Sequence, residues 1–320
     1  MNISVTAAIC VAAGFLISFL TGPIIIPLLR KLKFGQSILE IGPKWHKGKS
    51  GTPTMGGVIF ILAAAAVSCV FIRDIKGVFV LVFSLLSGLI GFLDDYIKVV
   101  KKRNLGLSPM AKVILMLIIT TGFSVIGIEL GVIETTLHIP FTGIYLELGY
   151  YISFFFIFMM IGFINSVNLT DGVDGLAASV TTVVTIFFTL FSMAYLEKGL
   201  AVFSASLCGG LIGFLVYNLN PAKVFMGDTG SLFLGGAVSA LAILNGEPLI
   251  IVIVGIIYLF EAVSVMLQVG YFKISGGKRI FKMAPFHHHL EMSGYSENKI
   301  VILFSLITLI ASVIAYLSVI

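Results

Sequence analysis

Long apolar stretches dominate the pattern of this chain. A helix needs about 20 predominantly apolar residues to cross the hydrocarbon core of a bilayer. We predict ten such spans, at residues 3–29, 54–72, 78–97, 110–130, 150–167, 176–196, 200–219, 231–245, 249–272 and 300–320. The first span has no basic segment before it and no small-residue cleavage site after it, so we expect it to remain as a helix. The pattern predicts an all-α integral membrane protein, with residues 1–320 forming a single polytopic domain.

The segment between the fourth and fifth predicted spans has a different pattern. Residues 129–148 contain Pro140 and alternating Thr, Ile and Tyr residues. Alternation favours strands, and proline favours a turn. We therefore predict a small β-hairpin here.

Composition supports a membrane protein. The chain is 58% hydrophobic and 11% charged, whereas a soluble domain has about 25% charged residues. This balance excludes a soluble, disordered or disulfide-stapled secreted protein. The cysteines Cys10, Cys69 and Cys208 lie inside apolar runs and are too scattered for a disulfide framework or a zinc site. We expect them to be small buried hydrophobic residues.

Basic residues give the orientation of the predicted spans. Of the 20 Lys and Arg residues, only Arg73, Lys76 and Lys198 fall in one set of alternate loops, and the other 17 fall in the opposite set. Basic loops stay in the cytoplasm, so we predict five cytoplasmic loops and both termini outside. Because the basic residues are interleaved with spans, anionic phosphate ligands or lipid headgroups, and not nucleic acid, are the expected partners of the +5 net charge.

Most of the aspartates lie on the same predicted side of the membrane as the basic residues. Asp74 is the exception, and the other five lie at the ends of predicted spans or in cytoplasmic loops. Carboxylates next to lipid are costly and often functional. A plain alternative is that helix ends tolerate charge, but this accounts for one or two acids and not for five on one side.

Asp94 and Asp95 lie at the cytoplasmic end of the third predicted span. Adjacent helical residues point about 100° apart, but at a helix end both carboxylates can reach a common ion or substrate. Neighbouring acids raise at least one pKa, which suits proton abstraction near neutral pH. The alternative is a solvated acidic helix end, which the helix dipole disfavours.

Where the fifth predicted span gives way to a loop, four polar residues recur every three positions: Asn165, Asn168, Asp171 and Asp174. Their oxygen and amide groups suit a hard cation or a ligand rich in hydroxyl groups. The segment lacks the bidentate Glu of an EF-hand, so the pattern favours a magnesium–phosphate or sugar site.

The turn before the eighth predicted span combines glycines with an acid. Gly227 and Gly230 allow close approach of the backbone to a ligand, Asp228 can hold Mg²⁺, and the following helix N-terminus favours a phosphate. Phe225 is able to stack on a flat base. The alternative is a turn of ordinary helix-capping residues.

Two further segments carry candidate chemistry. His287, His288 and His289 are consecutive, and adjacent histidines rarely ligate one zinc ion, so phosphate binding or proton shuttling is the favoured role. Lys49 precedes a glycine-rich turn that does not match a Walker loop, and a capping turn is the alternative. Carboxylates, lysines and hydroxyl or amide groups on one face indicate phosphoryl transfer to a lipid acceptor.

Five ordered motifs together carry a family resemblance across nearly the whole chain. They are residues 51–57 (Gly-Thr-Pro-Thr-Met-Gly-Gly), Asp94-Asp95, residues 165–175, residues 226–230 (Met-Gly-Asp-Thr-Gly) and residues 285–291 (Pro-Phe-His-His-His-Leu-Glu). The chain resembles the polyprenyl-phosphate N-acetylhexosamine-1-phosphate transferase superfamily. The first and last motifs resemble its phospho-N-acetylmuramoyl-pentapeptide transferase branch.

The resemblance implies a reaction and a cofactor. Phospho-MurNAc-pentapeptide would pass from UDP-MurNAc-pentapeptide to undecaprenyl phosphate, giving lipid I and UMP, with Mg²⁺ required. By this resemblance Asp228 is the Mg²⁺ ligand, and Asp94 and Asp95 are the catalytic pair, with Asp94 as base or nucleophile. One-step and two-step mechanisms both remain open.

The resemblance also implies substrate contacts and a cellular setting. His288 would be catalytic, and Phe225 would stack on uracil. The substrate-binding residues would be Lys49, Thr54, Asn165, Asn168, Asp171, Asp174, Phe225, Gly227, His287 and His289. The protein would be a homodimer in a bacterial plasma membrane, with its site facing the cytoplasm. Its lipid groove would involve the ninth span, where Glu261 is expected to face the bundle interior.

Two alternatives remain at this point. A polyprenyl-phosphate GlcNAc-1-phosphate transferase would share the aspartates and differ at the histidine motif. A transporter would need a charged or broken-helix path through the membrane, and Glu261 is the only acid in the interior of a predicted span, away from the span ends.

Overall fold

The computed structural model describes residues 2–32, 51–100 and 105–319. Its helices are α1 (Ile3–Lys31), α2 (Gly57–Phe71), α3 (Ile75–Val100), α4 (Pro109–Glu129), α5 (Ile152–Thr170), α6 (Leu176–Ala194), α7 (Lys198–Asn218), α8 (Gly227–Leu244), α9 (Ile250–Val254), α10 (Ile256–Ile274), α11 (Phe286–Glu291) and α12 (Glu297–Leu317). Two strands, β1 (Thr136–Ile139) and β2 (Ile144–Glu147), and a 3₁₀ turn, η2 (Gly149–Tyr151), lie between α4 and α5.

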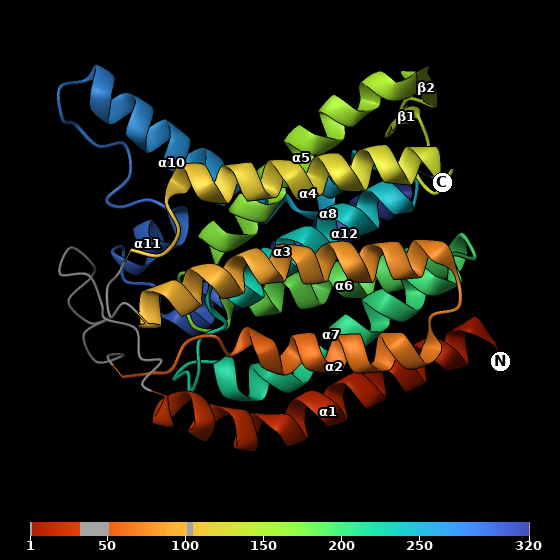
Figure 1. Cartoon of the computed structure of the whole chain (residues 1–320). Helices are drawn as coiled ribbons and strands as arrows, with labels where there is room; N and C mark the ends of the chain where they lie inside the picture. Colours follow the sequence, from red (N-terminus) through yellow and green to blue (C-terminus); the bar gives the residue numbers. More distant parts are fainter. Residues whose placement is uncertain (1, 33–50, 101–104, 320) are drawn as a thin grey trace.

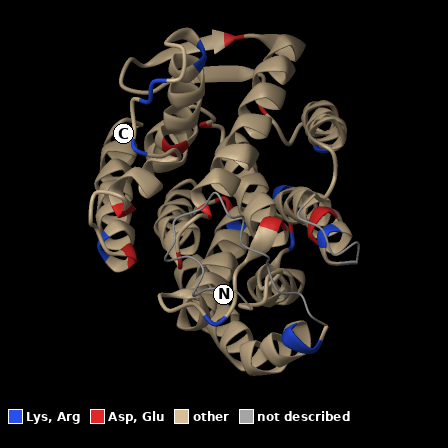
Figure 2. Ribbon diagram, turned by 90° about the vertical axis from the view of Figure 1, so that its left-hand side faces the viewer, with Lys and Arg blue, Asp and Glu red and all other residues tan. Residues whose placement is uncertain are grey.

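The helices form a multi-pass membrane bundle, as predicted. In the part of the chain that is described, nine helices are long and apolar enough to span a bilayer, and α2, with 15 residues, is shorter. Both termini and the β-hairpin lie at one end of the bundle, and α11 lies at the other (Figure 1). Viewed from the α11 end, the charged segments stand out among ribbons of uncharged residues (Figure 2).

The predicted hairpin is confirmed. β1 and β2 pair antiparallel, with Thr136 opposite Glu147 and Ile139 opposite Ile144. The Glu147 carboxylate accepts hydrogen bonds from the hydroxyls of Thr135 and Thr136, at 2.7 and 2.6 Å. These bonds fix the register where the chain returns towards α5.

Most predicted spans begin or end a few residues away from the observed helices, and two of the differences have a structural explanation. The second begins at Gly57 instead of residue 54, because Pro53 O accepts from the Phe225 N–H and the Gly56 N–H donates to Phe225 O, both at 2.8 Å. The ninth is not one continuous helix. It breaks at Gly255, where a Cβ would lie 2.8 Å from Cε1 of Phe163, so glycine permits a close approach to α5.

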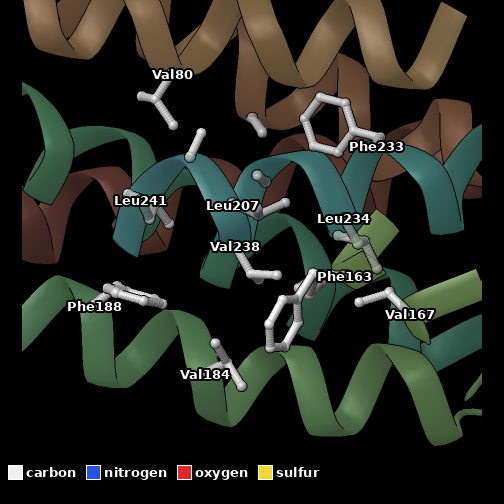
Figure 3. Close-up of a cluster of buried hydrophobic side chains, with 14 of the residues drawn as sticks. Val80, Phe163, Val167, Val184, Phe188, Leu207, Phe233, Leu234, Val238 and Leu241 are labelled. Atoms are coloured by element: carbon white, nitrogen blue, oxygen red, sulfur yellow. The ribbon is translucent and has the colours of Figure 1, made fainter. Parts of the chain in front are cut away.

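Helix α8 forms the centre of the bundle. Every residue from Thr229 to Leu244 is buried, as expected of a helix that is apolar all round. Phe233, Leu234, Val238 and Leu241 point from α8 towards side chains of α3, α5 and α6 (Figure 3). Because packing surrounds α8, its first turn, which carries Asp228, has a fixed place.

Small residues bring α1 and α7 together. A Cβ on Gly14 would lie 2.5 Å from Ser206 O, and one on Gly209 would lie 2.0 Å from Val11 O. Small residues at helix contacts let backbones approach closely in membranes. Cys10 and Cys208 are buried as predicted, whereas the prediction for Cys69 is wrong, since it lies on an exposed face of the short helix α2.

Candidate active site

Three carboxylates from two helices meet at the α11 end of the bundle. Asp94 and Asp95 come from α3, and Asp228 comes from the first turn of α8. One carboxylate oxygen of each lies within 4.8 Å of the others. Gly91 makes this possible, because a Cβ there would lie 2.0 Å from Asp228 O. Only a glycine lets α3 pass so close to the start of α8.

Asp95 anchors the first turn of α8. Its Oδ2 accepts hydrogen bonds from the Thr229 backbone N–H at 2.9 Å and from the Thr229 hydroxyl at 2.8 Å. The Asp95 side chain is buried. A carboxylate at a helix N-terminus satisfies otherwise unpaired N–H groups. Asp95 therefore holds the turn that carries Asp228.

Asp94 is held by two lysines and a backbone group. Its Oδ1 accepts from the Leu107 N–H at 2.7 Å, and its Oδ2 lies 2.6 Å from Lys98 Nζ and 3.1 Å from Lys112 Nζ. Gly106 leaves room for this carboxylate, since a Cβ there would lie 2.3 Å from Oδ1. The lysines compensate a charge that would otherwise be costly to bury.

Asp228 shares the same lysines and is the most open of the three acids. Its Oδ2 lies 3.1 Å from Lys98 Nζ and 2.8 Å from Lys112 Nζ. Its Oδ1 accepts from Asn168 Nδ2 at 3.0 Å, and the same amide donates to Ser231 Oγ at 2.7 Å. Asp228 is 18% exposed at the side chain, against 1% for Asp94. Of the three acids, Asp228 is therefore the most accessible to a ligand.

The acid cluster fits a hard divalent cation. Carboxylate and amide oxygens are the ligands that Mg²⁺ accepts in proteins, and Asp94, Asp95 and Asp228 offer such oxygens within 4.8 Å of one another. Asp228 is the best placed ligand, because its side chain is the most exposed of the three, whereas Thr229 occupies Asp95 Oδ2 and the Leu107 N–H occupies Asp94 Oδ1.

Asp171 belongs to the same charged region. It follows the last residue of α5, and its backbone N–H donates to Asn168 O at 3.2 Å. Burial, together with the negative charges of Asp228, Asp95 and Asp174, raises the pKa of Asp171 well above its ordinary value. Asp171 and Asp174, the last two residues of the repeat that begins at Asn165, therefore have different environments, because the Asp174 carboxylate binds a neighbouring turn.

Asp174 holds the turn that leads to Phe225. Its Oδ2 accepts from Asn220 Nδ2 at 3.1 Å and from the Ala222 N–H at 2.9 Å. Phe225 itself is half-buried, and its backbone N–H donates to Pro53 O. Asp174 thus connects the turn after α5 to the turn before α8.

Gly227 and Thr54 lie beside Asp95. Gly227 has a φ of +70°. A Cβ there would lie 2.6 Å from Asp95 Oδ2 and 2.7 Å from Thr54 Oγ1. The left-handed backbone and the tight space both require glycine.

Two predicted substrate residues are not placed at the cluster. Asn165 is exposed, and its amide donates to Ile161 O of its own helix at 2.8 Å and to Met116 Sδ at 3.5 Å. Lys49 lies outside the described residues.

The three histidines have separate environments in α11. His287 is buried, and its Nδ1 lies 3.1 Å from Glu261 Oε2. His288 Nδ1 lies 2.7 Å from Glu291 Oε2, and His289 Nδ1 accepts from the Lys282 N–H at 3.1 Å. Glu261 is completely buried, which confirms that it faces the bundle interior.

Lys98 and Lys112 are the site residues that the sequence analysis missed. Lys98 stands four residues after Asp94, a helical spacing that brings oppositely charged side chains together. That spacing was a usable signal. Lys112 lies in α4 and reaches the cluster only through the packing of that helix, so no local pattern marks it.

The comparisons with known proteins agree with this architecture. The model of glycosyl transferase family 4 matches residues 78–246, which include most of α3, all of α8 and the three acids. Signature 1 of phospho-N-acetylmuramoyl-pentapeptide-transferase matches residues 49–61. The helical membrane bundle and this match together define the protein as a membrane protein of the glycosyl transferase family 4 class.

Relatives define the family more narrowly. A phospho-N-acetylmuramoyl-pentapeptide-transferase of Carboxydothermus hydrogenoformans is 51% identical over 316 residues, 94% of this chain and 95% of the relative. Relatives of the same name are 48% identical in Caldanaerobacter subterraneus, over 95% of this chain and 96% of theirs, and 45% identical in Listeria monocytogenes, over 95% of both chains. The chain belongs to the phospho-N-acetylmuramoyl-pentapeptide-transferase family.

Proposed function

We propose that the protein transfers phospho-MurNAc-pentapeptide from UDP-MurNAc-pentapeptide to undecaprenyl phosphate, giving lipid I and UMP, as the first membrane step of peptidoglycan synthesis. The observation that carries the proposal is the cluster of Asp94, Asp95 and Asp228 with Lys98 and Lys112 at one end of a membrane bundle. Membership of the family supplies the identity of the donor and the acceptor.

The reaction forms one P–O bond and breaks another. An oxygen of the lipid phosphate attacks the phosphorus attached to the sugar, and the bond from that phosphorus to the oxygen of UMP breaks. A phosphate monoester keeps its last proton with a pKa of about 6. In a one-step reaction Asp94 accepts that proton, and in a two-step reaction the Asp94 carboxylate attacks first.

The lysines supply positive charge to the transferred group. Lys98 and Lys112 donate to carboxylate oxygens of Asp94 and Asp228. Phosphate oxygens entering this space accept from the same ammonium groups, which stabilises charge that spreads over them in the transition state. Asn168 keeps Asp228 oriented through its Nδ2.

We propose Mg²⁺ as the cofactor, with Asp228 as its ligand. When bound, Mg²⁺ would neutralise charge on the diphosphate and so favour the departure of UMP. Asp95 keeps its role of holding Thr229 and the α8 turn.

We propose that the α11 end faces the cytoplasm, where UDP-linked sugars are made, and that the protein is a homodimer. The basic residues gathered in the loops of this end support the orientation. The dimer rests on family resemblance, and chemical cross-linking in native membranes tests it.

The experiment is a donor comparison. Purified protein in detergent is incubated with undecaprenyl phosphate and either UDP-MurNAc-pentapeptide or UDP-GlcNAc, with Mg²⁺ or EDTA, and UMP release is measured. We expect release with the pentapeptide donor only, and its loss in EDTA. Release with UDP-GlcNAc alone would assign the GlcNAc-1-phosphate reaction, and release with neither donor would overturn the proposal.

A further inference from the structure

Glu261 and His287 form a buried pair that the reaction described above does not use. Glu261 lies in α10, His287 lies in α11, and both side chains are completely buried. A carboxylate at membrane depth is costly and usually has a partner and a function.

Three contacts define the pair. The His287 backbone N–H lies 3.1 Å from Glu261 Oε1 and 3.4 Å from Oε2, and its Nδ1 lies 3.1 Å from Oε2. The Glu261 carboxylate accepts from the His287 backbone N–H, and a proton on Nδ1 gives it a second donor from the same residue, which defines the Nδ1–H tautomer. In the neutral ring Nε2 is then an acceptor.

The acceptor nitrogen faces the turn after α5. Nε2 of His287 is buried and has no hydrogen-bond partner in the described parts of the chain. A Cβ on Gly172 would lie 2.2 Å from it. Gly172 directly follows Asp171, which belongs to the charged region of the active site. A buried acceptor left unpaired costs free energy and calls for a functional explanation.

We propose that Glu261 is a positioning residue, which holds the His287 imidazole as its Nδ1–H tautomer so that Nε2 faces the Asp171 turn as a hydrogen-bond acceptor for the bound sugar-phosphate donor. Gly172 is also required, because any side chain there would displace the imidazole ring of His287. The role of the pair in turnover rests on the proposed function, whereas the tautomer does not.

Glu261→Gln tests the pair from the α10 side. An amide can donate to Nδ1, which permits the opposite tautomer. In serine-protease triads a wrong tautomer lowers kcat by about 10⁴-fold, and here we expect a loss of at least about 10-fold with a smaller change in KM for the donor. Glu261→Asp retains the charge and should regain part of the rate.

Gly172→Ala tests the pair from the opposite side. The φ of Gly172 is outside the left-handed region, so alanine fits the backbone, but its Cβ would lie 2.2 Å from Nε2 and 2.7 Å from Cε1 of His287 and would displace the ring. We expect a loss of kcat like that of Glu261→Gln. Gly270→Ala is the matched control, since a Cβ there meets nothing within 4 Å.

A second control removes a buried polar contact from the same helix. Tyr258 lies one turn before Glu261, and its hydroxyl is 2.7 Å from Thr181 Oγ1. Tyr258→Phe should leave kcat within about twofold. Equal losses in Tyr258→Phe and Glu261→Gln would overturn a specific role for Glu261.

The direct readout is the histidine ¹⁵N spectrum of the full-length protein in detergent, where His287→Gln identifies the His287 signals among the five histidines. We expect a protonated Nδ1 and an unprotonated Nε2 in the wild type, and loss of this state in Glu261→Gln. A protonated Nε2 in the wild type, or an unchanged tautomer in an inactive Glu261→Gln protein, would overturn the proposal. This readout needs no turnover, so it separates failure of this inference from failure of the transferase function.

Discussion

At the scale of single residues, two lysines explain how three acids share one buried site. Lys112 bridges Asp94 and Asp228 at 3.1 and 2.8 Å. Lys112→Met leaves both carboxylates with less compensation and removes a donor to the transferred phosphate. We expect kcat to fall by about 10²-fold or more, measured by UMP release.

The matched control for Lys112 lies at the other end of the molecule. Lys76 Nζ is 2.6 Å from Glu197 Oε1, with both side chains partly exposed. Exposed ion pairs contribute little to stability, so Lys76→Met should keep the wild-type rate. If Lys112→Met kept it too, the assignment of Lys112 to the site would be wrong.

Asp171 gives a pH-dependent prediction. Its pKa is raised by burial and by Asp228, Asp95 and Asp174. An acid with a raised pKa binds its proton more tightly in the folded chain. The folded state is therefore progressively destabilised as the pH rises from the ordinary value of about 3.9 towards the folded pKa.

Asp171→Asn removes that penalty. In EDTA, the thermal stability gained by the variant should be larger at pH 8 than at pH 5, as followed by thermal unfolding in detergent. A gain that is the same at both pH values would show that the pKa of Asp171 is not raised.

At the scale of elements, the close contact of α1 and α7 depends on glycine. A Cβ on Gly209 would lie 2.0 Å from Val11 O, a backbone atom that cannot move aside easily. Gly209→Ala should cost about 1–3 kcal/mol through overpacking. Gly162→Ala is the control, because a Cβ there meets nothing within 4 Å. Similar unfolding temperatures for the two variants would contradict this packing.

The elements also show how far the sequence predicts the fold. The lengths of the apolar runs predict α3 to α8 to within a few residues, and the alternation in residues 129–148 predicts the hairpin. The break at Gly255 was missed because one glycine in an apolar run does not mark a helix end, and the close approach of Phe163 that this glycine permits is a tertiary contact. The burial of α8 on all sides agrees with its apolar sequence, although its span at residues 231–245 is the shortest of those predicted.

The residues of the site likewise fall into those that the sequence predicts and those that it does not. Asp94, Asp95 and Asp228 were predicted from acid-rich motifs, and the structure brings them together. Lys112 and the contact of Gly172 with His287 depend on tertiary packing, so no local pattern predicts them. Asn165 fits the three-residue repeat but lies on an exposed face of α5, since a repeat of three drifts around a helix of 3.6 residues per turn.

At the scale of the whole molecule, both termini lie at the end opposite α11 (Figure 1). With the active-site end in the cytoplasm, the C-terminus lies outside. Alkaline phosphatase fused after Ile320 should be active in cells, and a fluorescent protein that folds only in the cytoplasm should stay dark there. The reverse pattern would place the acid cluster outside and contradict the proposed orientation.

The central claim is that the acid cluster carries out the transfer, and a comparison of wild-type protein with Asp94→Asn tests it most directly. Both are purified as monodisperse protein and given UDP-MurNAc-pentapeptide, undecaprenyl phosphate and Mg²⁺, and UMP and the lipid-linked product are quantified together. We predict one UMP per lipid product from the wild type, and a fall of about 10²–10⁴-fold or more in Asp94→Asn, as expected for loss of a base or nucleophile. Wild-type rates in Asp94→Asn would contradict the account.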